Sequence, residues 1–483
     1  MTARDAAWRE ELRNAIHAKE RTAINRVTMP HVSPEERIKS NVEVNSGLTE
    51  EMALTEASRC LDCPNPGCIT GCPVGIDIPA FIKNIQRGET LKAAAVLKST
   101  SALPAVCGRV CPQEKQCESK CIYHKMGKEP VAIGYLERFA ADAALAAGRK
   151  ASDDSDKHGS LGRIAVVGSG PAGLSFAGQM AQFGYDVDVF EALHEIGGVL
   201  KYGIPEFRLP NSIVDSELAY LRSIGVKFHP NTIIGKTISV EKLQQNGYRG
   251  IFVASGAGLP RFMNIPGENL TGVMSSNEYL TRVNLMGAGR EGYATPVLRG
   301  ANVAVVGGGN TAMDSIRTAI RMGAKNAMLV YRRGEDEMPA RREEVAHAKE
   351  EGAKFMTLNN PVEYLGDEKG RVRSMRLQRM RLGEPDASGR RSPEPIEGDI
   401  AEVPVDLVIV AVGVSPKPIL PSSVEGLETT KKGTLGVDER LESSIPGLYA
   451  GGDIVRGGAT VILAMGDGRK AAKEMHEKLS ESK

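Results

Sequence analysis

The stretch RIAVVGSGPAG, residues 163–173, decides the fold of this chain. A short apolar strand predicted over Arg163–Gly168 runs into a glycine-rich turn, and a helix follows over Leu174–Phe183. Glycines permit a tight turn and a close approach of the backbone to a pyrophosphate, whose charge the helix N-terminus favours. A second strand over Asp186–Glu191 ends on a carboxylate at the distance expected of a ribose-binding acid. The pattern predicts a βαβ dinucleotide fold with contacts from Gly168, Gly170, Pro171, Ala172, Gly173 and Glu191.

The same pattern returns later in the chain, with a strand over Asn302–Gly307, a helix over Ala312–Met322 and a strand over Ala327–Tyr331. This strand ends on two arginines and carries no acid at its tip. A ribose 2′-hydroxyl favours a carboxylate, whereas a 2′-phosphate favours guanidinium groups, so we expect NADPH rather than NADH. The alternative interpretation of the arginine pair is a solvated surface charge. The residues predicted to bind this nucleotide are Gly307, Gly309, Asn310, Thr311, Arg332 and Arg333.

Two further features favour FAD at the first fold. Gly197 and Gly198 follow Glu191 closely, as in FAD-binding folds of the disulfide-reductase type. Far downstream, GLYAGGD (residues 447–453) resembles a second FAD fingerprint, in which the acid contacts the ribitol and a following helix presents its N-terminus to the flavin. An ordinary strand-end turn is the alternative. The additional residues predicted to contact FAD are Gly198, Leu200, Gly256, Gly452, Asp453, Thr460 and Val461.

All eight cysteines fall in one short window near the N-terminus, with the spacings Cys60-x2-Cys63-x4-Cys68-x3-Cys72 and Cys107-x3-Cys111-x5-Cys117-x3-Cys121. Such close spacing lets one loop wrap several corners of a cubane iron–sulfur cluster. Structural zinc is the alternative, but zinc favours paired CxxC knuckles, and only Cys60 and Cys63 have that spacing. The window therefore predicts iron–sulfur clusters.

Composition sets the remaining limits. The chain has 483 residues, 41% of them hydrophobic and 25% charged. Its formal net charge is +1, so the protein as a whole has no positive potential that would attract nucleic acid or an anionic membrane. Met1–Glu11 is charged and lacks the apolar core of a signal peptide, and the longest apolar stretch, Val403–Val414, is too short to span a bilayer. We therefore expect a cytoplasmic protein, in which clustered cysteines bind metal more often than they form disulfides.

The predicted fold class is α/β, with a helical N-terminal iron–sulfur domain followed by two Rossmann-like dinucleotide-binding domains. The polar run Ser152–Ser160 is a predicted linker. Gly256 and Gly413 each end an apolar strand and mark crossings between the two nucleotide domains. The predicted domains are a helical [4Fe–4S] domain over residues 1–155, an FAD domain split over 156–289 and 406–483, and an inserted NADPH domain over 290–405.

The order of these parts resembles the small subunit of bacterial NADPH-dependent glutamate synthase over nearly the whole chain. The same architecture occurs in the large subunit of electron-bifurcating ferredoxin:NADP transhydrogenase, in sulfide dehydrogenase and in the N-terminal part of dihydropyrimidine dehydrogenase. The resemblance is carried by five segments, Cys107–Glu114, Val167–Leu174, Tyr202–Pro210, Gly307–Asp314 and Gly451–Val461.

The resemblance implies two [4Fe–4S] clusters with interleaved ligands. Carried over by position, one cluster would be held by Cys60, Cys63, Cys68 and Cys121, and the other by Cys72, Cys111, Cys117 and Glu137. Cys107 would then be spare. Independently, a helix over about Val131–Ala147 would place Glu137 on an apolar stripe, where a carboxylate needs a partner. The alternative is a Glu at the edge of the stripe, paired with an Arg or Lys.

The resemblance also implies an enzyme that passes electrons from NADPH through FAD and the clusters to a partner subunit, so we expect a hetero-oligomer. The expected partner is the larger glutamate synthase subunit, and the complex would convert glutamine, 2-oxoglutarate and NADPH to two glutamates. One alternative partner is a small transhydrogenase subunit with a [2Fe–2S] cluster, and another alternative is a non-catalytic electron-transfer subunit. Hydride transfer needs no acid–base residue, so no catalytic residue is assigned.

Overall fold

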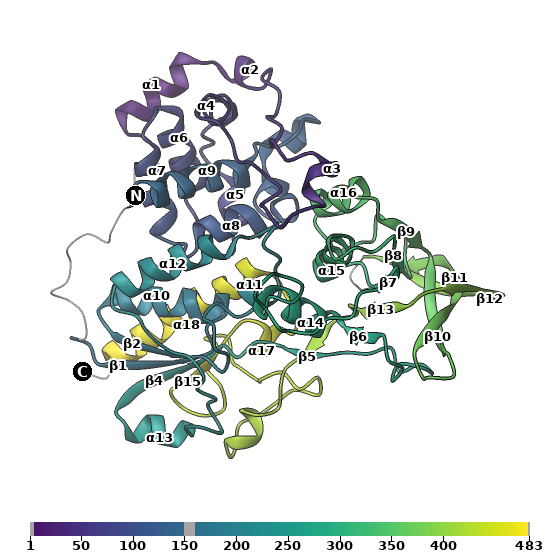
Figure 1. Cartoon of the computed structure of the whole chain (residues 1–483). Helices are drawn as coiled ribbons and strands as arrows, with labels where there is room; N and C mark the ends of the chain where they lie inside the picture. Colours follow the sequence, from purple (N-terminus) through teal and green to yellow (C-terminus); the bar gives the residue numbers. More distant parts are fainter. Residues whose placement is uncertain (1–3, 149–159, 388, 482–483) are drawn as a thin grey trace.

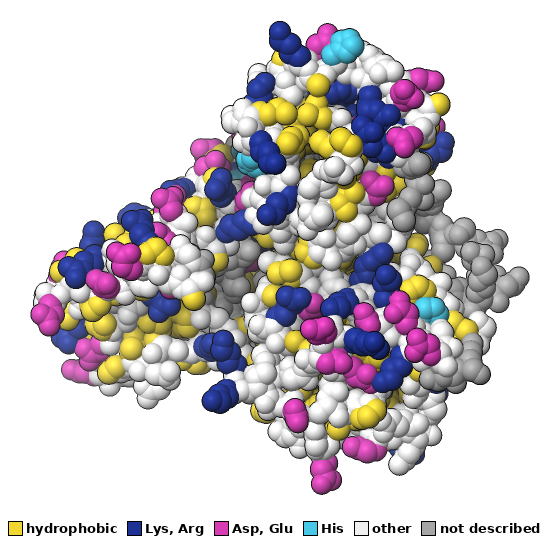
Figure 2. Space-filling model, turned by 180° about the vertical axis from the view of Figure 1, so that it is seen from behind, with side chains coloured by type: hydrophobic (Ala, Val, Ile, Leu, Met, Phe, Trp, Pro, Cys, Tyr) yellow, Lys and Arg dark blue, Asp and Glu magenta, His cyan; other side chains and the backbone are white. Residues whose placement is uncertain are grey.

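A computed structural model describes residues 4–148, 160–387 and 389–481. The predicted linker Ser152–Ser160 and the predicted boundary at 155/156 lie almost wholly outside these residues. Figure 1 shows a helical N-terminal part at the top, one sheet below it and a second sheet to the right. On the face in Figure 2, Lys and Arg side chains are interspersed with Asp and Glu, as the small net charge requires.

The N-terminal part consists of short helices. They are α1 (Ala7–Ala15), α2 (Ala18–Arg21), α3 (Pro34–Arg37), α4 (Glu50–Arg59), α5 (Gly67–Thr70), α6 (Ile78–Gln86), α7 (Thr90–Lys98), α8 (Pro104–Val110), η1 (Gln113–Lys115), η2 (Glu118–Lys120), η3 (Ile122–Met126) and α9 (Ile133–Ala146). The predicted helix over Val131–Ala147 is confirmed as α9, and Thr49 caps α4 by accepting a hydrogen bond from the Met52 amide at 3.2 Å.

The first sheet is parallel and has the order β15-β4-β1-β2-β3. Its strands are β1 (Arg163–Val167), β2 (Asp186–Phe190), β3 (Lys227–His229), β4 (Tyr248–Val253) and β15 (Leu448–Ala450). Its helices are α10 (Pro171–Phe183), α11 (Val199–Tyr202), α12 (Asn211–Ser223), α13 (Val240–Gln245), α17 (Asp453–Arg456) and α18 (Val461–Glu481). Side chains alternate along β1, so Ile164 and Val166 pack towards α10 and α18 while Ala165 and Val167 pack towards α13.

The second sheet is also parallel, with the order β6-β13-β7-β8-β9. Its strands are β6 (Val273–Ser275), β7 (Asn302–Val306), β8 (Asn326–Tyr331), β9 (Lys354–Thr357) and β13 (Leu407–Val410), and its helices are α14 (Ser276–Leu280), η5 (Thr281–Leu285), α15 (Asn310–Arg321) and α16 (Arg342–Glu350). A separate antiparallel sheet contains β10 (Asn359–Gly366), β11 (Val372–Pro385) and β12 (Arg391–Pro404) and extends outward in Figure 1.

The predicted insertion over residues 290–405 is too short. Both β6, before residue 290, and β13, after residue 405, belong to the second sheet. The chain crosses between the sheets at β5 (Leu259–Pro260), which pairs with β14 (Val414–Ser415), and a short turn, η6 (Pro421–Ser423), follows. The error has a physical cause: β13 is a buried apolar run, and such a run fits the centre of either parallel sheet equally well.

Two kinds of contact join the three parts. Hydrophobic residues of α8 and α9 belong to the same continuous core as β1, α10 and α18. Buried ions join the N-terminal part to the second sheet, because Glu351, after α16, accepts hydrogen bonds from Arg37 of α3 at 2.8 Å and from Arg317 of α15 at 2.8 Å. Arg317 and Arg321 also stack on the ring of Phe207. No helix within the described part of the chain is long and apolar enough to cross a lipid bilayer.

Candidate functional site

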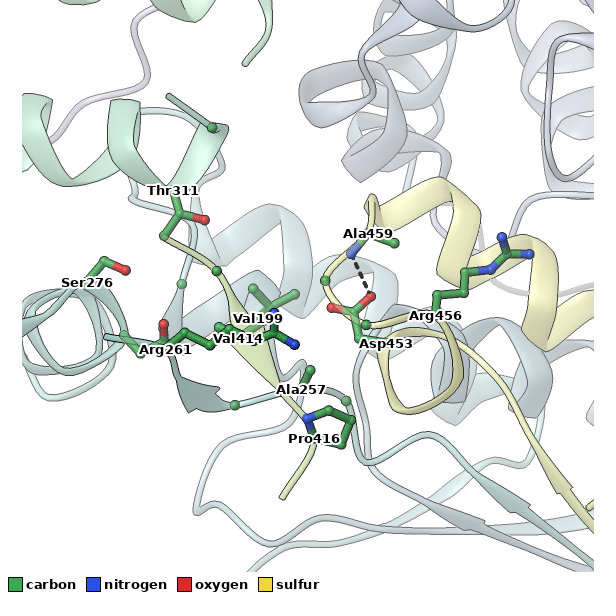
Figure 3. Close-up of a pocket in the computed structure, with 18 of the residues that line it drawn as sticks. Val199, Ala257, Arg261, Ser276, Thr311, Val414, Pro416, Asp453, Arg456 and Ala459 are labelled. Carbon is green, nitrogen blue, oxygen red and sulfur yellow. Dashed lines mark hydrogen bonds between the residues drawn. The ribbon is translucent and has the colours of Figure 1, made fainter. Parts of the chain in front are cut away.

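A cavity of about 1780 Å³ lies between the two parallel sheets and is lined by both glycine-rich turns. In Figure 3, Thr311 faces it from one side, and Asp453 and Ala459 face it from the other. Val110 and Pro112 of the cysteine-bearing part also line it. Ligands of parallel α/β sheets bind outside the carboxyl ends of the strands, which is where this cavity lies.

The first glycine of each turn holds the turn against a neighbouring strand. Gly168 has φ +102°, and a Cβ there would lie 2.4 Å from the carbonyl oxygen of Ala254, just after β4. Gly307 repeats the arrangement with φ +142° and the carbonyl of Ala411, also at 2.4 Å. Only glycine fits such a position, so both turns depend on it for their shape.

The acid at the end of β2 is tied to the first turn. Glu191 is buried at the cavity wall and accepts hydrogen bonds from the Ser169 amide at 2.9 Å and the Ser169 hydroxyl at 2.6 Å. The amide of Leu193 also donates to it, at 2.9 Å. The carboxylate therefore fixes the turn as well as facing the cavity.

The downstream glycine motif places the start of α18 at the cavity. Asp453 accepts a hydrogen bond from the Ala459 amide at 3.1 Å (Figure 3), and burial raises the pKa of Asp453 to about 6. The Thr460 hydroxyl accepts from the Leu463 amide at 3.3 Å and so caps α18. The helix predicted to follow the motif is confirmed as α18, and Thr460 and Val461 at its start both line the cavity.

The two arginines predicted to select NADPH differ in their surroundings. Arg332 is exposed and lines the cavity, and within the described residues its guanidinium forms no ion pair. Arg333 also lines the cavity, but it is buried and donates to Asp386 at 2.6 Å and to the carbonyl of Arg391 at 2.9 Å. Of the two, Arg332 is therefore the one whose guanidinium is available to a ligand. The guanidinium of Arg333 is occupied by Asp386 and the Arg391 carbonyl.

Three of the predicted contact residues do not line the cavity. Leu200 is fully buried in the core of the first fold. Gly173 lets α10 approach β1, since a Cβ there would lie 2.0 Å from the Gly168 carbonyl oxygen, and Gly452 lets the downstream motif approach Ala172. The predicted residues that do line it are Gly168, Gly170, Pro171, Ala172, Glu191, Gly198, Gly256, Gly307, Gly309, Asn310, Thr311, Arg332, Arg333, Asp453, Thr460 and Val461.

Sequence reasoning missed a buried ion pair at the junction of the two folds. Arg208 donates to both carboxylate oxygens of Asp314, at 2.8 and 2.7 Å, and both residues line the cavity. Burial raises the pKa of Asp314 to about 6, although the Arg208 guanidinium opposes that rise. A signal was available, because Arg208 and Asp314 lie in two of the sequence segments that carried the family resemblance.

The cysteines fall into two groups, and none of the eight forms a disulfide. Burial, followed by the charges of Cys60, Cys121 and Cys63, raises the pKa of the Cys68 thiol. The other group lies around the carboxyl of Glu137 and contains Cys72, Cys111 and Cys117. Burial is the main cause of the raised pKa of Cys72 and Cys117, and a hydrogen bond with Cys107 is the main cause for Cys111. The charge of Glu137 raises the pKa of all three thiols further. The residues that the resemblance assigned to each cluster are thus near neighbours.

The donor set fits a cluster better than a single ion. Within residues 4–148, 160–387 and 389–481, no three His, Cys, Asp or Glu side chains are arranged to hold one metal ion. A four-iron cluster is larger and takes its ligands at separate corners, so wider spacing suits it. Glu137 is buried, its Oε1 has no hydrogen-bond partner among the described residues, and burial raises its pKa to about 8.

The alternative for Glu137, an ion pair with Arg or Lys, is absent from the described residues. Cys107 is fully buried, and its Sγ lies 3.4 Å from the Met465 Sδ of α18. The spare cysteine therefore lies against the first nucleotide fold as well as beside Cys111.

Two facing dinucleotide folds and an adjoining iron–sulfur domain define an oxidoreductase that uses a flavin and a pyridine nucleotide. Family models agree: residues 37–149 match "Dihydropyrimidine dehydrogenase domain II, 4Fe-4S cluster", and residues 162–468 match "Pyridine nucleotide-disulphide oxidoreductase". The chain is 37% identical to the glutamate synthase [NADPH] small chain of Azospirillum brasilense, covering 93% of this chain and 94% of that one. It belongs to the glutamate synthase small-chain family.

Other relatives extend the comparison. The chain is 38% identical to the NADP(+)-dependent formate dehydrogenase subunit beta of Moorella thermoacetica, over 85% of this chain and 60% of that one. Among solved structures, FprA of Mycobacterium tuberculosis in complex with NADPH has a TM-score of 0.56 and 21% identity, over 66% of this chain and 85% of that one. At that identity, the likeness shows a shared fold only.

The glycine geometry predicts different effects for two neighbouring substitutions. Gly168→Ala should destabilise the fold, because its Cβ would clash with the Ala254 carbonyl. Gly170→Ala should leave the apoprotein's thermal midpoint unchanged, since a Cβ there meets no protein atom within 4 Å, but it should lower the flavin content. Thermal unfolding of the apoprotein and flavin absorbance of the purified protein measure these effects. Equal losses of stability in both variants would contradict this assignment.

Proposed function

We propose that this chain takes electrons from NADPH and passes them through FAD and two [4Fe–4S] clusters to the larger subunit of glutamate synthase. One observation carries the proposal: a single cavity is lined by both glycine-rich turns and by Pro112, the residue after Cys111. Both nucleotides would therefore bind in one cavity beside a candidate cluster ligand. FAD, when bound, accepts a hydride and releases its electrons singly, which is the chemistry that joins a pyridine nucleotide to iron–sulfur clusters.

The first sheet, with the returning β15 and α18, would hold FAD. Gly168 and Gly170 would bring the backbone to its pyrophosphate, and Glu191 would face its ribose. Asp453 would face the ribitol, and the capped start of α18 would direct its partial positive charge at the flavin. The buried walls of the cavity, which include Val110, would exclude water from the reacting ring.

The second sheet would hold NADPH. Gly307, Gly309, Asn310 and Thr311 would surround its pyrophosphate, and Arg332 would pair with the 2′-phosphate. The Asn310 side chain accepts a hydrogen bond from the Arg341 amide at 2.9 Å, so the turn is fixed before a nucleotide arrives. No acid–base residue is assigned, because hydride transfer moves no separate proton.

The ligands of the clusters would be those the resemblance implied. Cys60, Cys63, Cys68 and Cys121 would hold one cluster, and Cys72, Cys111, Cys117 and Glu137 the other. The unpartnered buried oxygen of Glu137 supports its role as the non-cysteine ligand, since a buried carboxylate without any partner is strongly unfavourable.

For the nucleotide, Arg332→Ala should raise the KM for NADPH by roughly 10- to 100-fold, because a charge-assisted hydrogen bond contributes about 1.5–3 kcal/mol. The KM for NADH should change little. Steady-state oxidation of each nucleotide with an artificial electron acceptor measures both values, and anaerobic stopped-flow mixing shows whether the nucleotide reduces the flavin. Arg376→Ala, at an exposed ion pair on β11, is the matched control. A wild-type flavin that NADPH does not bleach would exclude the proposed enzyme, and equal effects on both nucleotides would exclude Arg332 as the selector.

For the clusters, Cys107→Ser should keep the full iron content, whereas Glu137→Ala should perturb one cluster only. Iron analysis and electron paramagnetic resonance of the reduced protein measure these outcomes. If iron falls with Cys107→Ser and not with Glu137→Ala, each cluster instead takes four cysteines.

For the partner, affinity purification of the chain from its native host should recover a larger subunit, and that complex should oxidise NADPH only when glutamine and 2-oxoglutarate are both present. The glutamate synthase relatives support this choice. Recovery of a formate dehydrogenase subunit, as the name of the Moorella relative suggests, or of a small [2Fe–2S] flavoprotein would redirect the electrons to another acceptor.

A further inference from the structure

The segment between Cys60 and Cys63 lies among buried basic side chains. In Figure 1, α1, α2, α4 and α6 come together at the top of the molecule, and this segment follows α4 directly. Lys83 of α6 is fully buried, and its ammonium group donates to the Cys60 carbonyl and to the Gln86 side-chain oxygen, each at 2.6 Å. Arg21 of α2 is only 2% exposed. Its guanidinium donates to the carbonyls of Ile16, Ser58 and Leu12 and to Gln86.

Neither buried cation has a carboxylate partner in the part of the chain that the structure describes. Within the described residues, every hydrogen bond from Lys83 and Arg21 goes to a neutral oxygen, and neither side chain forms an ion pair. Lys83 contacts the backbone of Cys60 directly, and Arg21 contacts the backbone of Ser58, two residues before it. A buried charge with only neutral partners is costly, so an anionic group is expected beside these cations.

The nearby acids do not supply that anion. Asp62 is fully buried, but it accepts hydrogen bonds from Arg9 at 3.3 Å and from Arg13 at 2.7 Å. Glu56 pairs with Arg59 at 2.6 Å. Within the described part of the chain, Asp62 and Glu56 are thus engaged by other arginines, and Lys83 and Arg21 lie beside this segment without an ion pair of their own.

A cluster ligated by four thiolates carries net negative charge, and each electron that it accepts makes that charge larger. We propose that Lys83 and Arg21 act as positioning residues that raise the reduction potential of the cluster held by Cys60, Cys63, Cys68 and Cys121. The positive charge of these two side chains stabilises the reduced cluster more than the oxidised one, because their attraction grows with its negative charge. The inference rests on the ligand set of the proposed function. The other cysteine group differs, since the carboxylate of Glu137 faces it.

The test is a set of substitutions whose charges predict opposite shifts. Lys83→Met removes a positive charge but keeps a long side chain, and it should lower the midpoint potential of one cluster. Lys83→Arg keeps the charge and should restore a potential close to that of the wild type. Asp62→Asn removes a negative charge and should raise the potential. Asp62 has φ +50°, a conformation that Asn also adopts readily, so the loop should keep its shape.

Anaerobic redox titration of the purified full-length chain, followed by electron paramagnetic resonance, measures both midpoint potentials, and iron analysis accompanies each variant. Opposite shifts for Lys83→Met and Asp62→Asn, at unchanged iron content, support the proposal. Shifts in the same direction, or no shift in either variant, overturn it, because a purely structural role does not follow the sign of the charge. If Lys83→Met loses iron, Arg21→Met replaces it in the same comparison with Asp62→Asn. A wild-type chain that lacks this cluster would overturn the proposed ligand set, and this inference would fall with it.

Discussion

The close approach of each glycine-rich turn to a strand-end carbonyl is the constraint on which the rest of this molecule depends. Gly168 against the Ala254 carbonyl and Gly307 against the Ala411 carbonyl put the two turns at the carboxyl ends of their sheets. Parallel strands leave their free space at that edge, so the two edges must face each other to form one cavity. The short antiparallel pair β5–β14 is where the chain crosses between the sheets.

Electrostatics divides the N-terminal part into two environments. Around Cys60, the buried cations Lys83 and Arg21 hydrogen-bond only to neutral groups among the described residues. Around Cys72, Cys111 and Cys117, the Glu137 carboxyl has an oxygen, Oε1, with no hydrogen-bond partner in the described part of the chain. Each arrangement is unfavourable in the protein alone, and the two have opposite signs. Under the proposed function, each of these buried groups would face an iron–sulfur cluster.

Much of the fold could be predicted from the sequence, because short local patterns specify the strands, the glycine-rich turns and the helices. The strand–turn–helix units were located to within a few residues, and the helix expected after the downstream glycine motif is present as α18, which Thr460 caps. The predicted boundaries of the inserted domain were wrong, because an apolar run such as β13 is compatible with the centre of either parallel sheet. The engagement of Arg333 by Asp386 depends on residues 53 positions apart, and no local pattern reveals it. Lys83 gave a weak signal as the one cation in the apolar helix IPAFIKNIQ, but its neutral partners appear only in three dimensions.

The iron–sulfur part and the second nucleotide fold are joined by contacts that resist separation. Lys115, between Cys111 and Cys117, donates to the carbonyls of Pro339 at 2.8 Å and Ala340 at 3.0 Å, in the loop beside the second turn. Arg341 of that loop donates in return to the Arg109 carbonyl at 2.5 Å. A rotation of the second fold would leave these groups, and the buried Glu351 with its arginines, without partners, and each such loss costs about 1–3 kcal/mol or more. The same segment that carries two candidate cluster ligands therefore also helps to position the loop beside the second glycine-rich turn.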